Sequence, residues 1–154
     1  MKAAELQIGD WVSYNGKKYQ VTYLYCRPLP DGTLPANEVG FTHREDFWID
    51  TGHANPIFLT PEILGQNGFI HEYTECVVSK YYKHIVNEHV STAINVYFEK
   101  DMDVKVLVQI ETNLKVVSGV NSFHGCEIEH VHTFQHALRL CGLTELADNF
   151  KVEE

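Results

Sequence analysis

The sequence predicts a single α+β domain: an SH3-like small barrel or set of strands, a short central helix, and an antiparallel sheet with a C-terminal helix packed on it. Three observations predict this class. Residues 6–26 place a tight-turn pair between two apolar segments. Residues 92–100 and 104–111 alternate apolar and polar side chains, as strands with one buried face do. Helical start and stop signals flank residues 60–67, and apolar residues recur at helical spacing over 128–141.

Length and composition fit one domain of ordinary size. The chain has 154 residues, and its hydrophobic fraction of 44% is enough for a packed interior. The aromatic content of 12% favours β-structure over a helical bundle. We therefore expect one domain over residues 1–154, with residues 1–55 (SH3-like strands) and 56–150 (α+β) as its sub-lobes if it divides.

A β-hairpin is predicted between Leu6 and Cys26. Asn15-Gly16 is the preferred pair for a two-residue type I′ turn. Many SH3-like barrels begin with a segment such as 8–12 before a tight turn, which is an analogy of fold alone. After the turn, Tyr19, Val21, Tyr23 and Tyr25 alternate with other residues, so one face of the strand is expected to be aromatic. An aromatic binding surface would fit this pattern, although core packing accounts for most of its members: Trp11, Tyr14, Tyr19, Tyr23 and Tyr25.

The next segments are predicted as a loop and a strand. Residues 27–39 contain three prolines and an Asp-Gly pair, which favour an exposed loop. Residues 41–49 have the apolar content of a strand, and residues 51–55 connect it to the central helix.

The short helix at 60–67 is the element around which we expect the two halves of the chain to pack. Thr60 can accept a hydrogen bond from a first-turn N–H, and Pro61 suits the first helical position. Gly68 can adopt the left-handed conformation that ends a helix, and Phe69 can fold back on its last turn. A helix of about two turns is unstable alone in water, so its apolar neighbours must be buried between the halves. These neighbours are Ile57, Leu59, Ile63 and Leu64.

The second half is predicted to form an antiparallel sheet. Residues 76–86, 92–100 and 104–111 are expected to be strands, and the last two should pair. Residues 114–120 are expected to add a further strand, and residues 121–125 have the composition of a loop.

The closing helix is predicted from Ile128 to Cys141. Gly142 is expected to stop it, and residues 144–150 to form a short final turn. Its apolar face consists of Val131, Phe134, Ala137, Leu138 and Cys141.

Charge and cysteine content disfavour several function classes. The net charge of −9, from 21 acidic and 12 basic residues, repels phosphate backbones and disfavours direct nucleic-acid binding. Neither a signal peptide nor an apolar stretch of about 20 residues is present, so we expect a cytoplasmic protein without a membrane segment. The cysteines form no C-x-x-C pair and are expected to be reduced: Cys26, Cys76, Cys126 and Cys141.

Reactive side chains are densest around the closing helix. His132 and His136 are four residues apart and share a helical face, the spacing that zinc-binding helices use. His124 or Cys126 would complete a zinc site from the preceding loop. The simpler interpretation is a polar helix face that happens to contain histidines, because an isolated pair at this spacing is a frequent accident. That face carries His132, Gln135, His136 and Arg139.

Three segments carry recognisable motifs in a fixed order. Residues 6–12 match L-x-x-G-x-x-V, residues 56–69 match P-[IL]-x-L-T-x-E-[IL]-L…G-F, and residues 131–138 match V-H-x-[LF]-Q. In these motifs the chain resembles a group of uncharacterised short proteins of bacteria and of their phages and mobile elements. The resemblance implies no activity and no catalytic residue. It singles out His132 and Gln135, whose simplest role would be hydrogen bonding to a neighbouring loop or strand.

The leading functional hypothesis is a non-enzymatic accessory or interaction protein of a bacterial or phage mobile element. It would bind an unidentified protein partner and need no cofactor; its candidate binding residues are His132, Gln135, His136 and Arg139. The alternative is a small metal-binding protein or metal-dependent enzyme, with zinc held by His124, Cys126, His132 and His136. A third hypothesis is a nucleic-acid mimic that captures a basic protein.

Overall fold

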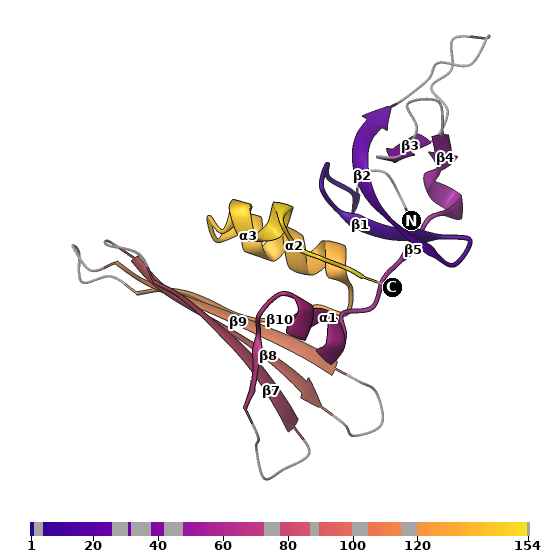
Figure 1. Ribbon diagram of the computed structural model, residues 1–154. Coiled ribbons are helices and arrows are strands. Elements are labelled where there is room, and N and C mark those ends of the chain that lie inside the picture. Colours follow the sequence, from indigo (N-terminus) through magenta and orange to yellow (C-terminus); the bar gives the residue numbers. More distant parts are fainter. Residues whose placement is uncertain are drawn as a thin grey trace. The chain divides into compact units, whose positions relative to one another are not determined.

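The protein is a mixed α+β structure with two antiparallel sheets. The computed structural model describes residues 1, 5–25, 31, 38–41, 48–72, 78–86, 90–99, 105–114 and 120–153. The chain forms two compact units, Met1–Phe58 with His130–Glu154, and Leu59–Glu129 (Figure 1). This grouping differs from the expected lobes 1–55 and 56–150, because the closing helix belongs to the first unit. Its packing on the second sheet stays a prediction.

The first unit contains a five-stranded sheet in the order β4-β3-β2-β1-β5. The described strands form an open sheet and not a closed barrel, so the SH3-like barrel stays a prediction. The strands are β1 (Trp11–Tyr14), β2 (Lys17–Tyr25), β3 (Glu38–Phe41), β4 (Trp48–Asp50) and β5 (Asn55–Pro56), with a 3-10 turn at Thr51–His53. The core beneath this sheet consists of Leu6, Val12, Val21, Ile49 and Ala54.

The hairpin between β1 and β2 confirms the predicted turn. Asn15 and Gly16 have φ angles of +49° and +76°, as both central residues of a type I′ turn require. Tyr14 therefore pairs with Lys17, and Val12 pairs with Tyr19.

A β-bulge in β2 changes which aromatic residues face the core. Val21 pairs with Phe41, but Tyr23 pairs with Gly40, so Thr22 is an extra residue on β2. Consecutive residues of β3 point to opposite faces, and Val21 and Tyr23 therefore do so too. The predicted single aromatic face over Tyr19, Val21, Tyr23 and Tyr25 is wrong for this reason.

The predicted strand over residues 41–49 is also wrong. Phe41 ends β3 and Trp48 starts β4, and these two strands pair antiparallel through Val39 and Ile49. Most of the predicted loop 27–39 lies outside the described residues, and its last two positions belong to β3.

Two helices complete the first unit, α2 (Val131–Leu140) and α3 (Thr144–Asp148). Gly142, with φ +77°, separates them as predicted. The Phe134 ring meets the Phe150 ring edge-on at 5.6 Å, and both side chains are fully buried. The helix α2 begins at Val131, three residues later than predicted, and the Val131 N–H donates a hydrogen bond to the Ile57 carbonyl.

The second unit begins with the predicted short helix, α1 (Pro61–Gln66). Thr60 Oγ1 accepts a hydrogen bond from the Ile63 N–H, and Pro61 occupies the first turn. Gly68 has φ +72°, and the Phe69 N–H donates to the Leu64 carbonyl at 3.1 Å. The α1 end signals are thus confirmed, with Ile63, Leu64 and Phe69 buried.

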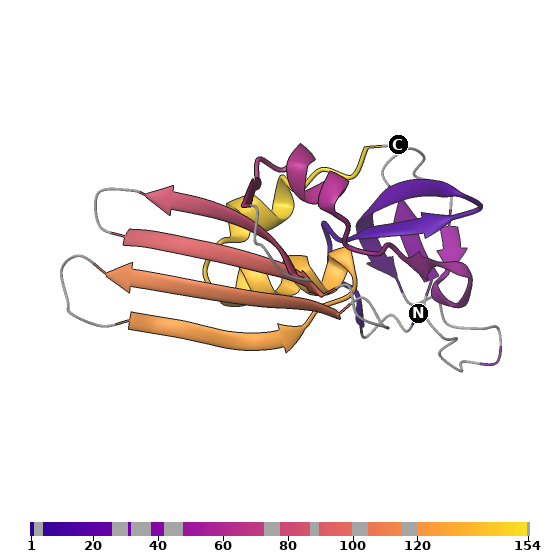
Figure 2. The ribbon, with the colours of Figure 1, turned by 90° about the horizontal axis from the view of Figure 1, so that it is seen from below.

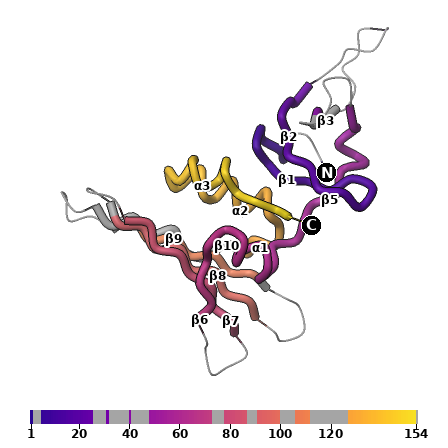
Figure 3. The backbone as a smooth tube through the Cα atoms, in the orientation of Figure 1, coloured from indigo at the N-terminus to yellow at the C-terminus, as the bar shows by residue number. Residues whose placement is uncertain are grey.

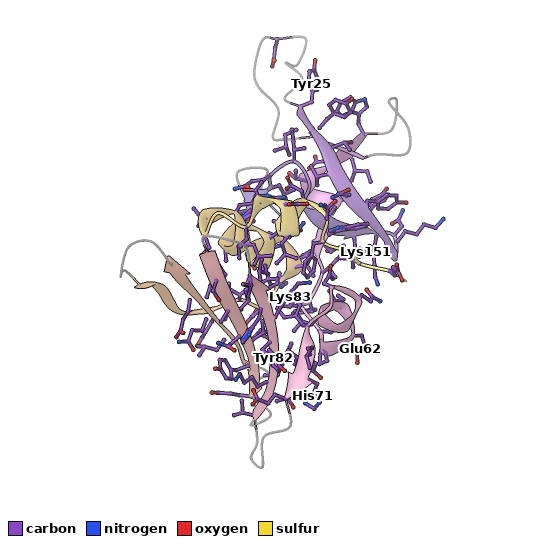
Figure 4. All side chains as sticks on the ribbon, turned by 60° about the vertical axis from the view of Figure 1, so that its left-hand side comes forward. Tyr25, Glu62, His71, Tyr82, Lys83 and Lys151 are labelled. Atoms are coloured by element: carbon purple, nitrogen blue, oxygen red, sulfur yellow. The ribbon has the colours of Figure 1, made fainter. Side chains whose placement is uncertain are left out.

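Lys83 supports the end of α1 from the neighbouring sheet. Its ammonium donates to the Asn67 carbonyl and lies 5.7 Å from the centre of the Phe69 ring. Figure 4 labels Lys83 on the second sheet. A cation near a helix C-terminus interacts favourably with the unpaired carbonyls there. Partial burial lowers the pKa of this ammonium.

The second sheet is an antiparallel meander in the order β10-β9-β8-β7-β6 (Figures 2 and 3). Its strands are β6 (Ile70–Glu72), β7 (Val78–Val86), β8 (Val90–Glu99), β9 (Lys105–Leu114) and β10 (Val120–Glu127). The predicted pairing of the two alternating segments is confirmed, with Phe98 opposite Val106. Alternate residues of these strands are buried: Ile94, Val96, Phe98, Val106, Val108 and Ile110.

The strand β10 corrects two predictions. A further strand was expected over 114–120, but Leu114 ends β9 and the next strand, β10, starts only at Val120. Residues 115–119 lie outside the described part of the chain. Residues 121–125 form the middle of β10 and not a loop. A register shift between Phe123 and Cys126 interrupts the pairing there.

Candidate functional site

The polar face of α2 lies against the N-terminal turn and is centred on Asp10. Asp10 is fully buried, and its Oδ2 accepts a hydrogen bond from the Gln7 N–H at 2.7 Å. The same oxygen is 2.6 Å from His136 Nε2. Oδ1 accepts from Arg139 Nη1 at 2.6 Å. Asp10, Gln135, His136 and Arg139 are called the Asp10 cluster below.

Gln135 uses its side-chain amide to join three backbone groups. Its Oε1 accepts from the Trp11 N–H at 3.1 Å, and its Nε2 donates to the carbonyls of Gly9 (2.9 Å) and Ala147 (2.8 Å). The residue is fully buried, so its replacement by an apolar residue would remove this partner from the Trp11 N–H and the Ala147 carbonyl, whereas the Gly9 carbonyl would keep its bond from Gln20 Nε2 at 3.1 Å. This is the hydrogen bonding to a neighbouring loop that the sequence left open as its simplest role.

Gly9 and Trp11 allow the N-terminal turn to pack closely against the Asp10 cluster and the C-terminal segment. Gly9 has φ +93°, and a Cβ there would lie 2.8 Å from Arg139 Nη2, so a side chain would meet both backbone strain and a clash. The Trp11 indole donates to the Phe150 carbonyl at 2.6 Å and holds the C-terminal segment nearby. Arg139 also bonds Asp148 Oδ1 at 3.1 Å, on the exposed side of the cluster.

His132 is the second buried polar residue on this face. Its side chain is 5% exposed, and burial lowers its pKa to about 4, despite the opposing field of Asp10. The imidazole is therefore neutral at pH 7. Its Nδ1 is buried without a hydrogen-bond partner among the described residues. The ring centres of His130 and His136 lie 5.7 Å and 5.9 Å from the ring centre of His132.

The zinc-site prediction depends on residues from both units. Within the described part of the chain, no three His, Cys, Asp or Glu side chains are grouped so that they could hold a metal ion. His136 Nε2 is already engaged by Asp10. His124 and Cys126 lie on β10 and not on a loop, and their side chains are outside the described part. The zinc site stays a prediction.

An aromatic patch lies on the sheet of the first unit, formed by Tyr23, Tyr25 and Trp48. Their exposed fractions are 56%, 47% and 41%. The Trp48 ring centre is 5.3 Å from that of Tyr25 and 6.5 Å from that of Tyr23. Tyr25 lies at the far end of β2 (Figure 4).

Gly40 makes room for this patch. A Cβ at Gly40 would lie 2.9 Å from Trp48 Cζ3 and 3.1 Å from Tyr23 Cβ. The indole therefore lies directly over the backbone of the middle strand, β3. This close approach holds Trp48 against the sheet while leaving much of the ring in contact with water.

The sequence anticipated this patch only in part. Of the five aromatic residues considered there, Tyr14 and Tyr19 pack against the core, whereas Tyr23 and Tyr25 join the patch. Trp48 was missed because it was assigned to a strand interior. Asp10 was also missed, although a charged residue within the apolar segment 8–12 was the available signal.

None of the helices in the described part of the chain has the length and apolar character needed to span a bilayer. No protein-family model, curated protein or solved structure significantly matches this chain.

Proposed function

We propose that this protein is a non-enzymatic interaction protein that binds a protein partner through its aromatic patch. The observation that carries the proposal is the exposure of three contacting aromatic rings, Tyr23, Tyr25 and Trp48, on a sheet face. Tyr and Trp are the residue types most enriched at binding hot spots, because each buries a large rigid surface at little entropic cost. Scattered exposed apolar residues need no explanation, but a contiguous aromatic group does.

The Asp10 cluster supports a binding role over catalysis. Its carboxylate, amide and guanidinium groups are engaged by other groups of the first unit, in hydrogen bonds that hold the N-terminal turn against α2. In this proposal the predicted binding residues His132, Gln135, His136 and Arg139 act in folding and not in recognition. The acidic net charge of −9 supports a protein partner rather than a nucleic acid.

The biological setting is proposed from the sequence alone. The motif resemblance supports an accessory protein of a bacterial or phage mobile element, and the free thiol of Cys141 supports the reducing cytoplasm. The open five-stranded sheet supports an SH3-like relationship through the order of its hairpin strands.

Capture from a bacterial host lysate tests the proposed interface. Wild-type protein and a Tyr25→Ser/Trp48→Ala double variant would be immobilised, cross-linked to bound proteins and compared by mass spectrometry. The matched control is Phe58→Ala, which removes an aromatic side chain that is 65% exposed elsewhere on the same unit. We expect a partner that is retained by wild type and control and lost from the double variant. Identical captured proteins in all three samples would contradict the proposal.

Zinc binding is the second candidate function, and one observation favours it. The buried Nδ1 of His132 has no partner among the described residues, and neutral imidazole nitrogens are common donors to zinc in proteins. Metal analysis of protein purified without a histidine tag tests this candidate. Stoichiometric zinc that is lost in a His132→Ala/His136→Ala variant would establish it, and metal-free folded protein would eliminate it.

A further inference from the structure

We propose that the aromatic patch binds an arginine-containing basic segment of the partner, with the guanidinium stacked on Trp48. This inference rests on the proposed function and names the chemistry that its partner must carry. It follows from the acidic residues beside the patch, from the charge of the surrounding segment, and from the contact between the rings.

Strand register places acidic positions beside the aromatic rings. Tyr23, Gly40 and Trp48 are paired across three strands. In the neighbouring row, Tyr25 and Asp50 are both paired with Glu38. Residues directly opposite in antiparallel strands share a face. Asp50 is exposed, two residues after Trp48 on β4, and its Oδ1 accepts from the Gly52 N–H at 2.7 Å, which restrains its carboxylate.

The segment that builds the patch is acidic. Residues 21–50 contain five acidic residues and two arginines, a net charge of −3. The lysines of β2, Lys17 and Lys18, are at its other end, about 17 Å or more along the strand from Tyr23. Carboxylates beside an apolar patch attract cations and repel phosphate groups. Charge therefore favours a basic protein segment over nucleic acid as the occupant.

The ring geometry favours a cation stacked on one ring over a cation enclosed by several rings. Trp48 and Tyr25 are tilted by 48° and their centres are 5.3 Å apart, so the two rings touch each other. No cation fits between touching rings, which disfavours a cage around a quaternary ammonium group. A planar guanidinium needs only one exposed ring face, and it can also form hydrogen bonds to a neighbouring carboxylate. Trp48 offers that face, and Asp50 offers the carboxylate.

Peptide binding tests this inference with the full chain. The probe is a fluorescein-labelled peptide of alternating arginine and serine, compared by anisotropy with lysine and glutamate versions. We expect the arginine peptide to bind more tightly than the lysine peptide, and Trp48→Ala or Tyr25→Ser to weaken it about fivefold. Asp50→Asn keeps the acceptor for the Gly52 N–H and removes the charge, so it should weaken binding and reduce its salt dependence. Phe58→Ala should have no effect.

The outcomes of the peptide and capture experiments separate arginine stacking from partner binding through the patch. Equal binding of arginine and lysine peptides, or unchanged binding by both patch variants, would overturn arginine stacking. Absence of arginine-peptide binding at low salt would also overturn it. The proposed function would still stand if the capture experiment retains a patch-dependent partner. It would fall separately if no partner depends on the patch. Circular dichroism of each variant checks that the first unit remains folded, and the two single patch variants provide independent tests.

Discussion

Replacement of Asp10 by alanine should sharply destabilise the first unit. The carboxylate is fully buried and is contacted by the Gln7 N–H, by His136 and by Arg139. Its removal leaves a guanidinium with 14% of its side chain exposed and only weaker partners. Breaking one side of a buried ion pair typically costs 3–5 kcal/mol. Because Arg139 keeps its bonds to Asp148 and to the Ile8 carbonyl, we expect a loss near the lower end, about 3 kcal/mol.

Asp148→Ala is the matched control, since Asp148 bonds the same arginine. Its side chain is 53% exposed and the ion-pair distance is 3.1 Å. An exposed pair of this kind contributes about 0–1 kcal/mol. The two variants therefore remove the same chemical group from the same partner and differ chiefly in burial.

Urea unfolding followed by tryptophan fluorescence measures both effects. The chain has two tryptophans, Trp11 and Trp48, and both belong to the first unit, so the signal reports on that unit. We expect the free energy of unfolding to fall by at least about 2 kcal/mol more in Asp10→Ala than in Asp148→Ala. Equal losses in the two variants would refute the structural role assigned to Asp10.

Three further predictions concern local features. His132 has a folded pKa of about 4, below its ordinary value of 6.5, so the unfolded chain binds more protons between these values. The stabilising contribution of the neutral His132 imidazole should therefore be fully present above pH 6.5 and fall by about 3 kcal/mol towards pH 4. His132→Leu should lack this component in parallel urea titrations. Superimposable pH profiles of wild type and variant would contradict the assignment. Thr60→Ala should lower the free energy of unfolding of the second unit by about 1 kcal/mol, because the α1 cap is lost, and Thr60→Ser should lower it much less. Far-ultraviolet circular dichroism during denaturation measures both variants. Equal losses of stability would exclude the cap. Gly40→Ala should displace the Trp48 ring and change the tryptophan emission, because the new methyl group would lie 2.9 Å from Trp48 Cζ3. The control is Gly65→Ala on α1, whose methyl group meets no atom within 4 Å and should leave the emission unchanged. An unaltered spectrum in Gly40→Ala would show that the ring does not lie over β3.

Local elements were predictable because their signals are local. Thr60, Pro61 and Gly68 specify the ends of α1 through backbone groups within a few residues. Asn15-Gly16 specifies the hairpin turn in the same way. The alternating residues of β8 and β9 predicted their pairing, since both strands bury one face.

The errors occurred where pairing between strands decided the structure. The extra residue Thr22 turns Tyr23 outward, and nothing in the alternation of β2 marks that position. Residues 121–125 have loop composition, yet 121–123 pair with β9, whose edge offers backbone groups for the next strand. Side-chain pattern alone does not reveal either event, because each depends on a partner strand.

The sequence by itself determined the α+β class, the capped helix α1, the first hairpin and the paired strands β8 and β9. Only the tertiary structure decided what the polar face of α2 contacts. Gln135 meets the Trp11 N–H across 124 residues of chain, and Arg139 meets Asp10 across 129. Local propensity and periodicity describe the backbone over a few turns, whereas hydrogen bonds at such separations depend on where the folded chain returns. The same reason explains why the aromatic patch, which joins strands β2 and β4 over Gly40, became visible only in three dimensions.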